Sequence, residues 1–254
     1  MFDLTGKTAI ITGSSKGIGR SIAFAMAEQG ANVVVSSRKV DACQVVADEI
    51  NQKYEGKSGR AMVIPCNISD TTALQMLVDE TRAKLDKIDI LDCNAATNPY
   101  FGSIQNIPEK AIDKLMDNNI KSNILLCQMV IPEMVERKEG SIIIISSVGG
   151  LKASTVIGGY NVTKAADIMI VKNLAAEFGK HNVRTNAIAP GLFRTDFAKA
   201  LWENPDILKA STAGCPMRRI GEPDEIGGAA VFLASKAGSF VNGHTLVVDG
   251  GVMV

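Results

Sequence analysis

The chain is poor in the residues that build metal sites, disulfide frameworks and base-stacking surfaces. Aromatic residues make up 5% of its 254 positions, two histidines are present, and the five cysteines lie far apart without a C-x-x-C pair. Few aromatics argue against a nucleic-acid stacking surface, and scattered cysteines with two histidines argue against zinc. We expect free thiols in a reducing compartment and no bound metal.

Neither one sign of charge nor a long apolar segment stands out. The 27 basic and 27 acidic side chains cancel, so there is no electrostatic reason to expect binding to nucleic acid or to an acidic membrane. No apolar stretch approaches the ~18 residues of a membrane span. The start, MFDLTGKTAI, does not resemble a signal peptide, and the end, GGVMV, is no peroxisomal address. We expect a cytoplasmic protein.

Apolar residues make up 46% of the chain, and short β-branched runs alternate with helical patterns. The expected strands are 7–12, 31–37, 60–65, 88–92, 141–146, 183–188 and 244–249. The expected helices are 17–29, 40–53, 70–86, 110–137, 160–179 and 223–235. The alternation predicts right-handed βαβ crossovers, and therefore an α/β fold with a parallel sheet covered on both faces. Residues 193–214 form a long insertion before the last helix, and such insertions are often lids.

The first expected strand runs directly into a glycine-rich turn, TGSSKGIGR. Gly13, Gly17 and Gly19 have the spacing G-x-x-x-G-x-G. Glycine lets the backbone bend sharply and lets a phosphate approach the amides at a helix start. Such turns also occur for structural reasons alone, but the position between the first strand and the first helix favours nucleotide binding.

The end of the second expected strand, VVVSSRKV, indicates which nucleotide is bound. NAD sites place an acid here, whereas NADP sites place an arginine near the 2′-phosphate. The acid position holds Ser37, Arg38 follows it, and Lys16 in the glycine turn is close enough to join. Two cations and no carboxylate favour NADP(H). The alternative is that Arg38 and Lys39 form only a solvated loop.

The stretch GGYNVTKAA places Tyr160 and Lys164 one helical turn apart, so that on a helix they share a face. A cation held beside a phenol favours the phenolate and lowers the tyrosine pKa. An ordinary amphipathic helix would show the same pair. The pair therefore indicates acid–base chemistry only if the rest of the fold places it in a pocket.

Further motifs follow in a fixed order: TGSSKGIG (12–19), CNAA (93–96), DNNIKSN (117–123), ISS (145–147), YNVTK (160–164), APGLFRTD (189–196) and VNGHTLVVDGG (241–251). Together they resemble the short-chain dehydrogenase/reductase family over nearly the whole chain. The SSRK turn, CNAATNPYFG and APGLFRT look closest to its NADPH-dependent carbonyl and retinal reductase branch. The resemblance implies one Rossmann-like doubly wound domain over residues 1–254, with a seven-stranded parallel sheet and helices on both faces.

The resemblance also implies the roles of four residues. Tyr160 would donate a proton to a carbonyl oxygen during reduction and act as the base in the reverse direction. Lys164 would bind the nicotinamide ribose and, with the oxidised nicotinamide, lower the tyrosine pKa. Ser147 would hold the substrate oxygen, and Asn119 would bind a water that links Lys164 to solvent. Ser146 competes with Ser147, but its spacing from Tyr160 is less like that of the family.

The cofactor NADP(H) would be held by a larger set implied by the same resemblance. Its members are Gly13, Ser15, Lys16, Gly17, Ile18, Gly19, Ser37, Arg38, Asn67, Ile68, Asn94, Ala95, Tyr160, Lys164, Pro190, Gly191 and Thr195. The family also leads us to expect a homotetramer, in which the helices at 110–137 and 160–179 pair across a twofold interface.

Some residues depart from the family pattern or allow two interpretations. Ala96 stands where glycine is common, and nothing in the sequence explains Asp92, because a buried carboxylate needs partners. Asn94 is expected to bond backbone between the central strands, and Thr195 to cap the lid or meet the carboxamide. Phe193, Phe197 and Trp202 line a pocket or pack an amphipathic lid helix onto the core.

Three functions are compatible with these residues. The first is an NADPH-dependent reductase of ketones or aldehydes that also works in reverse on secondary alcohols. The second is a 3-oxoacyl reductase for carrier-linked chains, which needs basic docking residues; Lys172 is present, but Ala176 stands where such relatives tend to have arginine. The third is a non-catalytic NADP sensor, against which the intact Asn119, Ser147, Tyr160 and Lys164 argue.

Overall fold

The computed structural model describes residues 1–56 and 59–254, and its centre is a parallel seven-stranded sheet with the order β3-β2-β1-β4-β5-β6-β7. The strands are β1 (Thr8–Thr12), β2 (Asn32–Ser36), β3 (Ala61–Val63), β4 (Ile90–Cys93), β5 (Gly140–Ile145), β6 (Val183–Pro190) and β7 (Thr245–Val248). The chain leaves β3 on one side and resumes beside β1 with β4, so the order reverses between β1 and β4. The predicted parallel α/β fold is confirmed.

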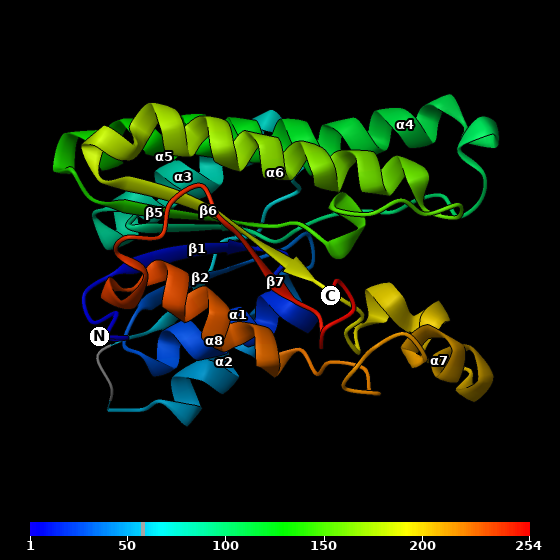
Figure 1. Cartoon of the computed structure of the whole chain (residues 1–254). Helices are drawn as coiled ribbons and strands as arrows, with labels where there is room; N and C mark the ends of the chain where they lie inside the picture. Colours follow the sequence, from blue (N-terminus) through cyan, green and yellow to red (C-terminus); the bar gives the residue numbers. More distant parts are fainter. Residues whose placement is uncertain (57–58) are drawn as a thin grey trace.

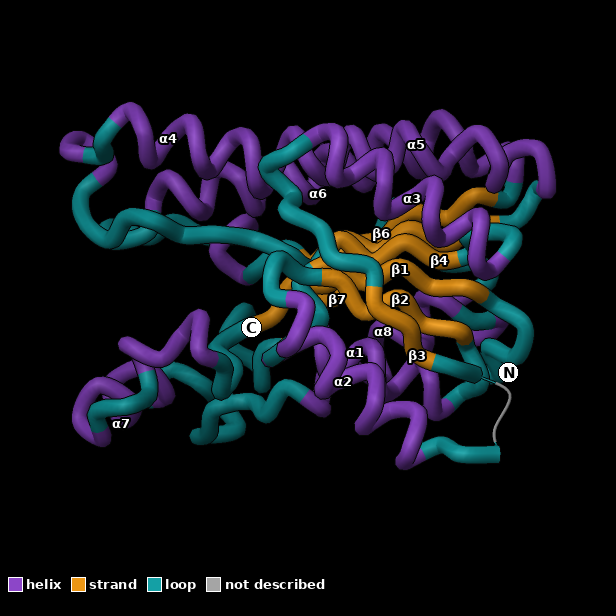
Figure 2. The backbone as a smooth tube through the Cα atoms, turned by 180° about the vertical axis from the view of Figure 1, so that it is seen from behind, coloured by secondary structure: helices purple, strands orange, loops and turns teal. Residues whose placement is uncertain are grey.

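Two layers of helices cover the sheet (Figures 1 and 2). One layer consists of α1 (Gly17–Glu28), α2 (Val40–Lys53) and α8 (Asp224–Ala234). The other consists of α3 (Thr71–Leu85), α4 (Glu109–Leu115), α5 (Ser122–Arg137) and α6 (Gly158–Phe178). Because each strand is buried from both sides, its sequence is apolar throughout rather than alternating.

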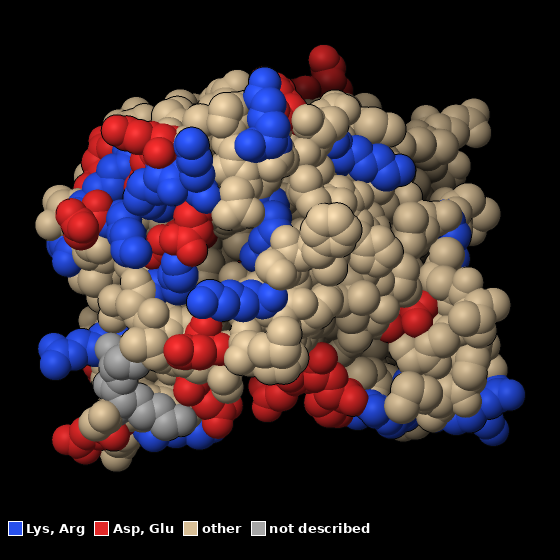
Figure 3. Space-filling view, turned by 60° about the vertical axis from the view of Figure 1, so that its left-hand side comes forward, with Lys and Arg blue, Asp and Glu red and all other residues tan. Residues whose placement is uncertain are grey.

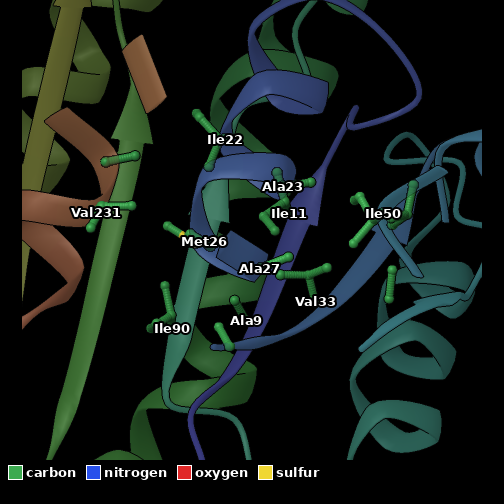
Figure 4. Packing of buried hydrophobic residues seen from close by; sticks show 14 of the residues in the cluster. Ala9, Ile11, Ile22, Ala23, Met26, Ala27, Val33, Ile50, Ile90 and Val231 are labelled. Atoms are coloured by element: carbon green, nitrogen blue, oxygen red, sulfur yellow. The ribbon is translucent and has the colours of Figure 1, made fainter. Parts of the chain in front are cut away.

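Alternate residues of β1 enter the two halves of the core. Ala9 and Ile11 pack against Ile22 and Met26 of α1 (Figure 4), whereas Ile10 joins the cluster under α3 and α5. All five side chains are fully buried. The period of two along the strand therefore anchors both helical layers to the same central strand.

The insertion at 193–214 lies beyond the carboxyl ends of the strands, next to the C-terminus of the chain (Figure 1). It contains a 3-10 turn at Asp196–Leu201 and the short helix α7 (Pro205–Thr212), whose start is capped by Asn204. In open parallel sheets, ligands bind outside the carboxyl ends of the strands. The insertion is therefore placed where a lid is needed.

The main difference from the predicted elements is that the single helix expected over 110–137 is interrupted. The structure has α4, then a π-helical turn over Met116–Lys121, and then α5. A π turn shifts the backbone hydrogen bonds from i−4 to i−5 and is common near functional sites, and periodicity along the sequence does not reveal it. Elsewhere the boundaries move by a few residues. Asp70 caps α3 by accepting from the N–H groups of Thr72 and Ala73.

The described helices include none whose length and apolar character would let it cross a membrane. Basic and acidic side chains are interleaved on the face that comes forward in Figure 3, so that face carries no patch of a single sign. All five cysteines are free and buried, as the sequence predicts.

Candidate active site

The glycine turn between β1 and α1 is held too tightly for any other residue at Gly19. A Cβ there would lie 2.4 Å from the Asn94 side-chain nitrogen and 2.6 Å from the Gly13 carbonyl oxygen. Gly13 itself has φ +68°, and Gly17 has φ +57°, a region that residues with a Cβ rarely adopt. The turn therefore brings bare backbone to the surface at the start of α1.

Asn94 fastens this turn to β4. Its Nδ2 donates to the carbonyl oxygens of Thr12 at 2.9 Å and Gly13 at 3.2 Å. The N–H groups of Asn94 and Ala95 both donate to the Thr12 hydroxyl oxygen at 3.1 Å. The expected backbone-bonding role of Asn94 between the central strands is confirmed.

The start of α1 has the character of an anion site. No side chain caps it, and its first turn contains no acidic residue. Its amides and positive dipole end therefore favour a phosphate. The side chain of Lys16 points elsewhere, since its Nζ lies 2.9 Å from Asp196 Oδ2 at the start of the insertion. Thr195 also lies close to the glycine turn, because a Cβ added to Gly17 would be 3.3 Å from the Thr195 Cγ2.

The loop after β2 carries an exposed arginine. Arg38 makes no ion pair within the described ranges, and Ser37, at the acid position, contacts the Cys43 sulfur at 3.1 Å. Asn67 is exposed after β3, and its Oδ1 accepts a hydrogen bond from the Ser69 hydroxyl at 3.0 Å. Arg38 is thus free to meet an anionic group, and the residues present fit a dinucleotide with a 2′-phosphate.

The remaining predicted cofactor contacts lie along the same edge of the sheet. Ser15, Ile18 and Ile68 are half-buried. Pro190 ends β6, and a Cβ on the following Gly191 would come within 2.8 Å of the Asp249 Cα. The backbone is therefore packed closely where the resemblance places the nicotinamide segment.

Thr195 begins the insertion in a capping role, one of the two roles predicted for it. Its hydroxyl accepts from the Ala198 N–H at 3.4 Å, and its carbonyl accepts from the Trp202 indole N–H at 2.8 Å. The Arg194 guanidinium also lies over the Trp202 ring, 5.3 Å from the centroid of that ring. Trp202 thus braces the insertion rather than lining a cavity.

Tyr160 and Lys164 share the buried face of α6, as their spacing predicts. Tyr160 is 9% exposed and Lys164 is 2% exposed, and the Lys164 Nζ lies 5.7 Å from the Tyr160 ring centroid. The Ser147 side chain lies close enough to the Tyr160 hydroxyl to lower the pKa of the phenol. The ring of Phe197, from the insertion, lies 5.7 Å from the Tyr160 ring. The structure therefore brings three distant segments together around one phenol.

The protein groups alone do not make this phenol more acidic. Burial has the largest effect and raises the pKa of Tyr160. The Lys164 ammonium and the nearby Ser147 side chain lower the pKa, whereas the Asp167 carboxylate raises it. The pKa of Tyr160 ends above its ordinary value. A lowered tyrosine pKa therefore requires a further positive charge close to the hydroxyl.

The two neighbouring serines have different partners. Ser146 is buried, and its hydroxyl donates to the Lys164 carbonyl oxygen at 2.7 Å, which ties β5 to α6. Ser147 is half-buried, its hydroxyl oxygen accepts from the Gly149 N–H at 3.0 Å, and its side chain lowers the pKa of the nearby Tyr160. Ser147 therefore lies at the phenol, and Ser146 does not.

Asn119 lies in the π turn and uses its side chain on a neighbouring loop. Its Oδ1 accepts from the Thr97 N–H at 2.8 Å, and its Nδ2 donates to the Thr97 carbonyl oxygen at 2.9 Å and to the Thr163 hydroxyl at 3.1 Å. Its backbone carbonyl accepts from the Asn123 amide at 2.9 Å. The amide therefore positions the loop after β4 against α6.

A cavity of about 270 Å³ adjoins this cluster, and Phe197 lines it. Its other lining residues are Ala96, Thr97, Asn98, Pro99, Phe101 and Lys114. Asn98 Oδ1 has no hydrogen-bond partner within the described chain. Phe193, by contrast, is 5% exposed and belongs to the core, so of the three predicted lid aromatics only Phe197 lines the cavity.

Two residues that sequence reasoning missed complete the cluster. Asp167, three residues after Lys164, is fully buried, and its Oδ2 lies 2.9 Å from the Lys164 Nζ. Asn123 of α5 donates to the other Asp167 oxygen at 3.0 Å. The available signal was a carboxylate on the same helical face as Lys164 within an otherwise apolar stretch.

Asp92 is a second buried carboxylate, and within the described chain neither of its oxygens has a hydrogen-bond partner. Burial raises its pKa well above the ordinary value and so favours the neutral form. In the unfolded chain it ionises near pH ~3.9. Because the folded state holds the extra proton, the stability is greatest below that pH and falls as the pH rises toward the folded pKa.

Replacing Asp92 by valine is therefore expected to stabilise the fold at pH 7, by roughly 1–3 kcal/mol, or about 2–4 °C in Tm for each kcal/mol. The gain should be smaller at pH 4, where about half of the unfolded wild-type chains are also protonated at this carboxyl. Thermal unfolding at the two pH values measures it. Asp92→Asn is the matched variant that removes the titration but keeps the unpartnered polar atoms. Destabilisation by valine at pH 7 would contradict this prediction.

Comparison with known proteins agrees with the geometry. The family model described as enoyl-(acyl carrier protein) reductase matches residues 13–253. A parallel sheet of this order, with a glycine turn and a buried Tyr–Lys pair at its carboxyl edge, defines a Rossmann-like oxidoreductase. The chain belongs to the short-chain dehydrogenase/reductase family.

Particular members of the family are similar along their whole length. The chain is 41% identical over 249 residues to dehydrogenase/reductase SDR family member 4 of Bos taurus. The aligned region covers 98% of this chain and 88% of the bovine protein. A structure of 7 alpha-hydroxysteroid dehydrogenase complexed with NADH and 7-oxo glycochenodeoxycholic acid has a TM-score of 0.92 at 38% identity, covering 98% and 95% of the two chains. A gluconate 5-dehydrogenase from Burkholderia cenocepacia J2315 in complex with NADP and tartrate has a TM-score of 0.91 at 33% identity, covering 99% and 96%.

Proposed function

We propose that this protein is an NADP(H)-dependent reductase of ketones and aldehydes that also oxidises secondary alcohols. The observation that carries the proposal is the buried Tyr160 phenol, which lies near Lys164 and Ser147 and against Phe197, a residue that lines a largely apolar cavity. The glycine turn and the uncapped start of α1 supply the place for the cofactor phosphates.

In the proposed reaction, the bound cofactor supplies or accepts the hydride. As negative charge grows on the carbonyl oxygen, Ser147 and Tyr160 donate hydrogen bonds to it, and Tyr160 passes its proton. Lys164 keeps its positive charge near the phenol and reduces the cost of the phenolate. The positive charge of the oxidised nicotinamide would add to this effect, which the protein alone does not supply.

Selection of NADP(H) over NAD(H) is assigned to Arg38. The side chain is exposed and makes no ion pair in the described ranges, and Ser37 replaces the acid that binds ribose hydroxyls in NAD sites. Relatives have been seen with either nucleotide, since the gluconate 5-dehydrogenase structure contains NADP and the hydroxysteroid dehydrogenase structure contains NADH. The loop after β2 therefore has to decide the preference.

A 3-oxoacyl reductase is the second candidate, favoured by the similarity of the chain to a structure of a 3-oxoacyl (acyl-carrier-protein) reductase from Agrobacterium tumefaciens C58 with NADP bound. Acyl carriers are acidic and need basic residues beside the active site. Lys172 and Ala176 are both exposed on α6, and one lysine gives a weak docking surface. Lys114 at the cavity is a further basic residue. We rank this function below the reduction of small carbonyl compounds.

The test is NADPH oxidation by the purified protein with diketones, aromatic ketones and acetoacetyl thioesters, in parallel with NADPH binding by calorimetry. Turnover of the free ketones supports the proposal. Turnover restricted to the thioesters would select the 3-oxoacyl function. Tight NADPH binding without any turnover would select a non-catalytic sensor and end the enzymatic proposal.

Phe197 is expected to bind the apolar part of the substrate. Its ring lines the cavity and is 51% exposed in this structure. Truncation to alanine should remove about 0.5–1.5 kcal/mol of aromatic contact, which raises KM for aromatic ketones roughly 2- to 12-fold. Phe240→Ala, a truncation of an exposed ring outside the cavity lining, is the control in the same steady-state assay. Equal KM values for both variants would contradict the assignment.

Two further expectations stay predictions. A homotetramer is supported by apolar side chains left exposed on α6, namely Val162 at 49% and Met169 at 54%. A cytoplasmic location is supported by the free, reduced cysteines.

A further inference from the structure

A carboxylate is buried directly behind the Lys164 ammonium. Asp167 lies one turn further along α6, and the Lys164 Nζ donates to its Oδ2 at 2.9 Å and to the Ile145 carbonyl oxygen at 2.7 Å. The side chains of Lys164 and Asp167 are 2% and 0% exposed. An ammonium has three donors, so these two bonds fix its position and leave one donor for another group.

Asp167 is itself held from the neighbouring helix. Its Oδ1 accepts from the Asn123 Nδ2 at 3.0 Å, and the same nitrogen donates to the Asn119 carbonyl oxygen at 2.9 Å. A continuous chain of hydrogen bonds thus runs from the π turn through Asn123 and Asp167 to Lys164. It joins Asn119 to Lys164 through protein groups alone.

Stability is a poor explanation for this arrangement. Removing two charges from water offsets most of their mutual attraction, so a buried ion pair adds little net stability compared with apolar residues of similar size. The Lys164 ammonium lies 5.7 Å from the centroid of the Tyr160 ring, and both charges of the pair act on the pKa of the phenol. Its position therefore points to the electrostatics of the site.

We propose that Asp167, braced by Asn123, is a positioning residue that fixes the Lys164 ammonium and sets the pH range in which Tyr160 can exchange its proton. This inference rests on the proposed function, because it assigns Tyr160 the proton transfer. It adds two residues, Asp167 and Asn123, to the group that acts there.

The charge of Asp167 acts on both of its titrating neighbours in the same direction. Burial lowers the pKa of Lys164, but Asp167 and Tyr160 raise it above its ordinary value. Asp167 likewise raises the pKa of Tyr160, against the effect of Lys164. Burial raises the pKa of Asp167 itself, while the hydrogen bonds from Lys164 and Asn123 favour its charged form.

The other titratable groups facing the pair are thiols. The neighbouring Cys127 thiol of α5 and burial raise the pKa of Cys93 of β4 well above its usual value, so Cys93 stays neutral. Among the described groups around the ammonium, Asp167 is therefore the carboxylate that pairs with it, 2.9 Å from the Lys164 Nζ. Loss of its charge should lower the pKa values of both Tyr160 and Lys164.

The direct test is Asp167→Asn, because the amide oxygen can still accept from the Lys164 Nζ while the charge is gone. Carbonyl reduction needs protonated Tyr160, so its alkaline decline should begin at lower pH than in the wild type. Alcohol oxidation needs the phenolate, so its acidic rise should also begin at lower pH. Steady-state pH profiles in both directions measure these shifts. Profiles that coincide with the wild type would overturn the proposal.

A second readout needs no substrate. In protein labelled at the tyrosine Cζ, the resonance of Tyr160, assigned with Tyr160→Phe, should titrate at lower pH in Asp167→Asn than in the wild type. Unchanged titration rejects the role of Asp167, whereas a shift in a protein without turnover rejects the proposed function alone. Asp92→Asn, a change at another buried carboxyl that has no bond to Lys164 or Tyr160 in the described chain, is the control that should shift neither readout.

Asn123→Ser tests the brace separately and covers the case in which Asp167→Asn does not fold. The carboxylate remains, so the pH limbs should stay near those of the wild type. The ammonium loses its fixed direction, and kcat should fall roughly 10- to 100-fold with little change in KM. An unchanged kcat would show that Asn123 does not support the site and would overturn that part of the proposal.

Discussion

Tyr160→Phe is expected to lower kcat for carbonyl reduction by about 100- to 10,000-fold, the range in which a positioned general acid contributes. The substitution removes one oxygen from a ring that is 9% exposed and packed against Phe197, so the shape of the site is retained. Ser147 would remain as the single hydrogen-bond donor to the substrate oxygen. The residual rate therefore measures what Ser147 and the bound cofactor achieve without proton transfer from the phenol.

The loss should fall on kcat rather than on binding of the nucleotide. The phenol contributes chiefly when charge develops on the substrate oxygen, and an interaction of that kind lowers kcat and kcat/KM together. Affinity for NADPH, measured by calorimetry, should change by less than about twofold, since the glycine turn and Arg38 are untouched.

Tyr54→Phe is the matched control for this change. Tyr54 is 6% exposed, lies at the end of α2 and packs edge-on against Phe24, in the helical layer on the other side of the sheet. It loses the same oxygen in a comparably buried place. Equal turnover by Tyr160→Phe and wild type would show that another group transfers the proton, and the proposed mechanism would be wrong.

Arg38→Asp should raise KM for NADPH far more than KM for NADH. A contact between a guanidinium and a phosphate is worth about 1.5–3 kcal/mol, so its loss predicts roughly a 10- to 100-fold increase. The new carboxylate would repel the 2′-phosphate, and it stands where NAD sites bind ribose hydroxyls. KM for NADH should therefore stay constant or fall. The ratio of KM for NADPH to KM for NADH should then show a reversed cofactor preference.

Arg60→Asp makes the same change of charge at an exposed position on the amino side of β3. It controls for the general effect on an anionic cofactor of losing one positive charge and gaining one negative charge. The prediction is contradicted if Arg38→Asp and Arg60→Asp raise KM for NADPH equally, because the effect would then be the overall field and not a contact. Steady-state kinetics at a fixed carbonyl concentration, at low and physiological salt, separates the two.

Much of the fold could be predicted from local patterns. All seven expected strands are present, because apolar β-branched runs buried on two faces are a strong and short-range signal. The helix expected over 110–137 was wrong in one respect, the π turn at Met116–Lys121. That turn depends on contacts with Thr97 and Thr163, which are distant in the sequence.

The candidate site was predictable only in part, for the same reason. Tyr160 and Lys164 lie on one helix, and the spacing of one turn places them together. The sequence offered three possible lid aromatics, and packing left Phe197 against Tyr160 and buried Phe193 in the core. The partner of Lys16 was also unexpected, since Asp196 lies 180 residues further along the chain.

The sequence by itself determined the alternation of strands and helices, the glycine turn at the start of α1, and the Tyr–Lys pair on α6, because each depends on neighbours within a turn or a strand. The tertiary structure decided which groups surround that pair: Ser147 from the end of β5, Phe197 from the insertion, and Asn123 holding Asp167 from α5. The physical reason is that the carboxyl ends of parallel strands meet at one edge of the sheet, so the electrostatics of the phenol depend on residues that only packing brings together.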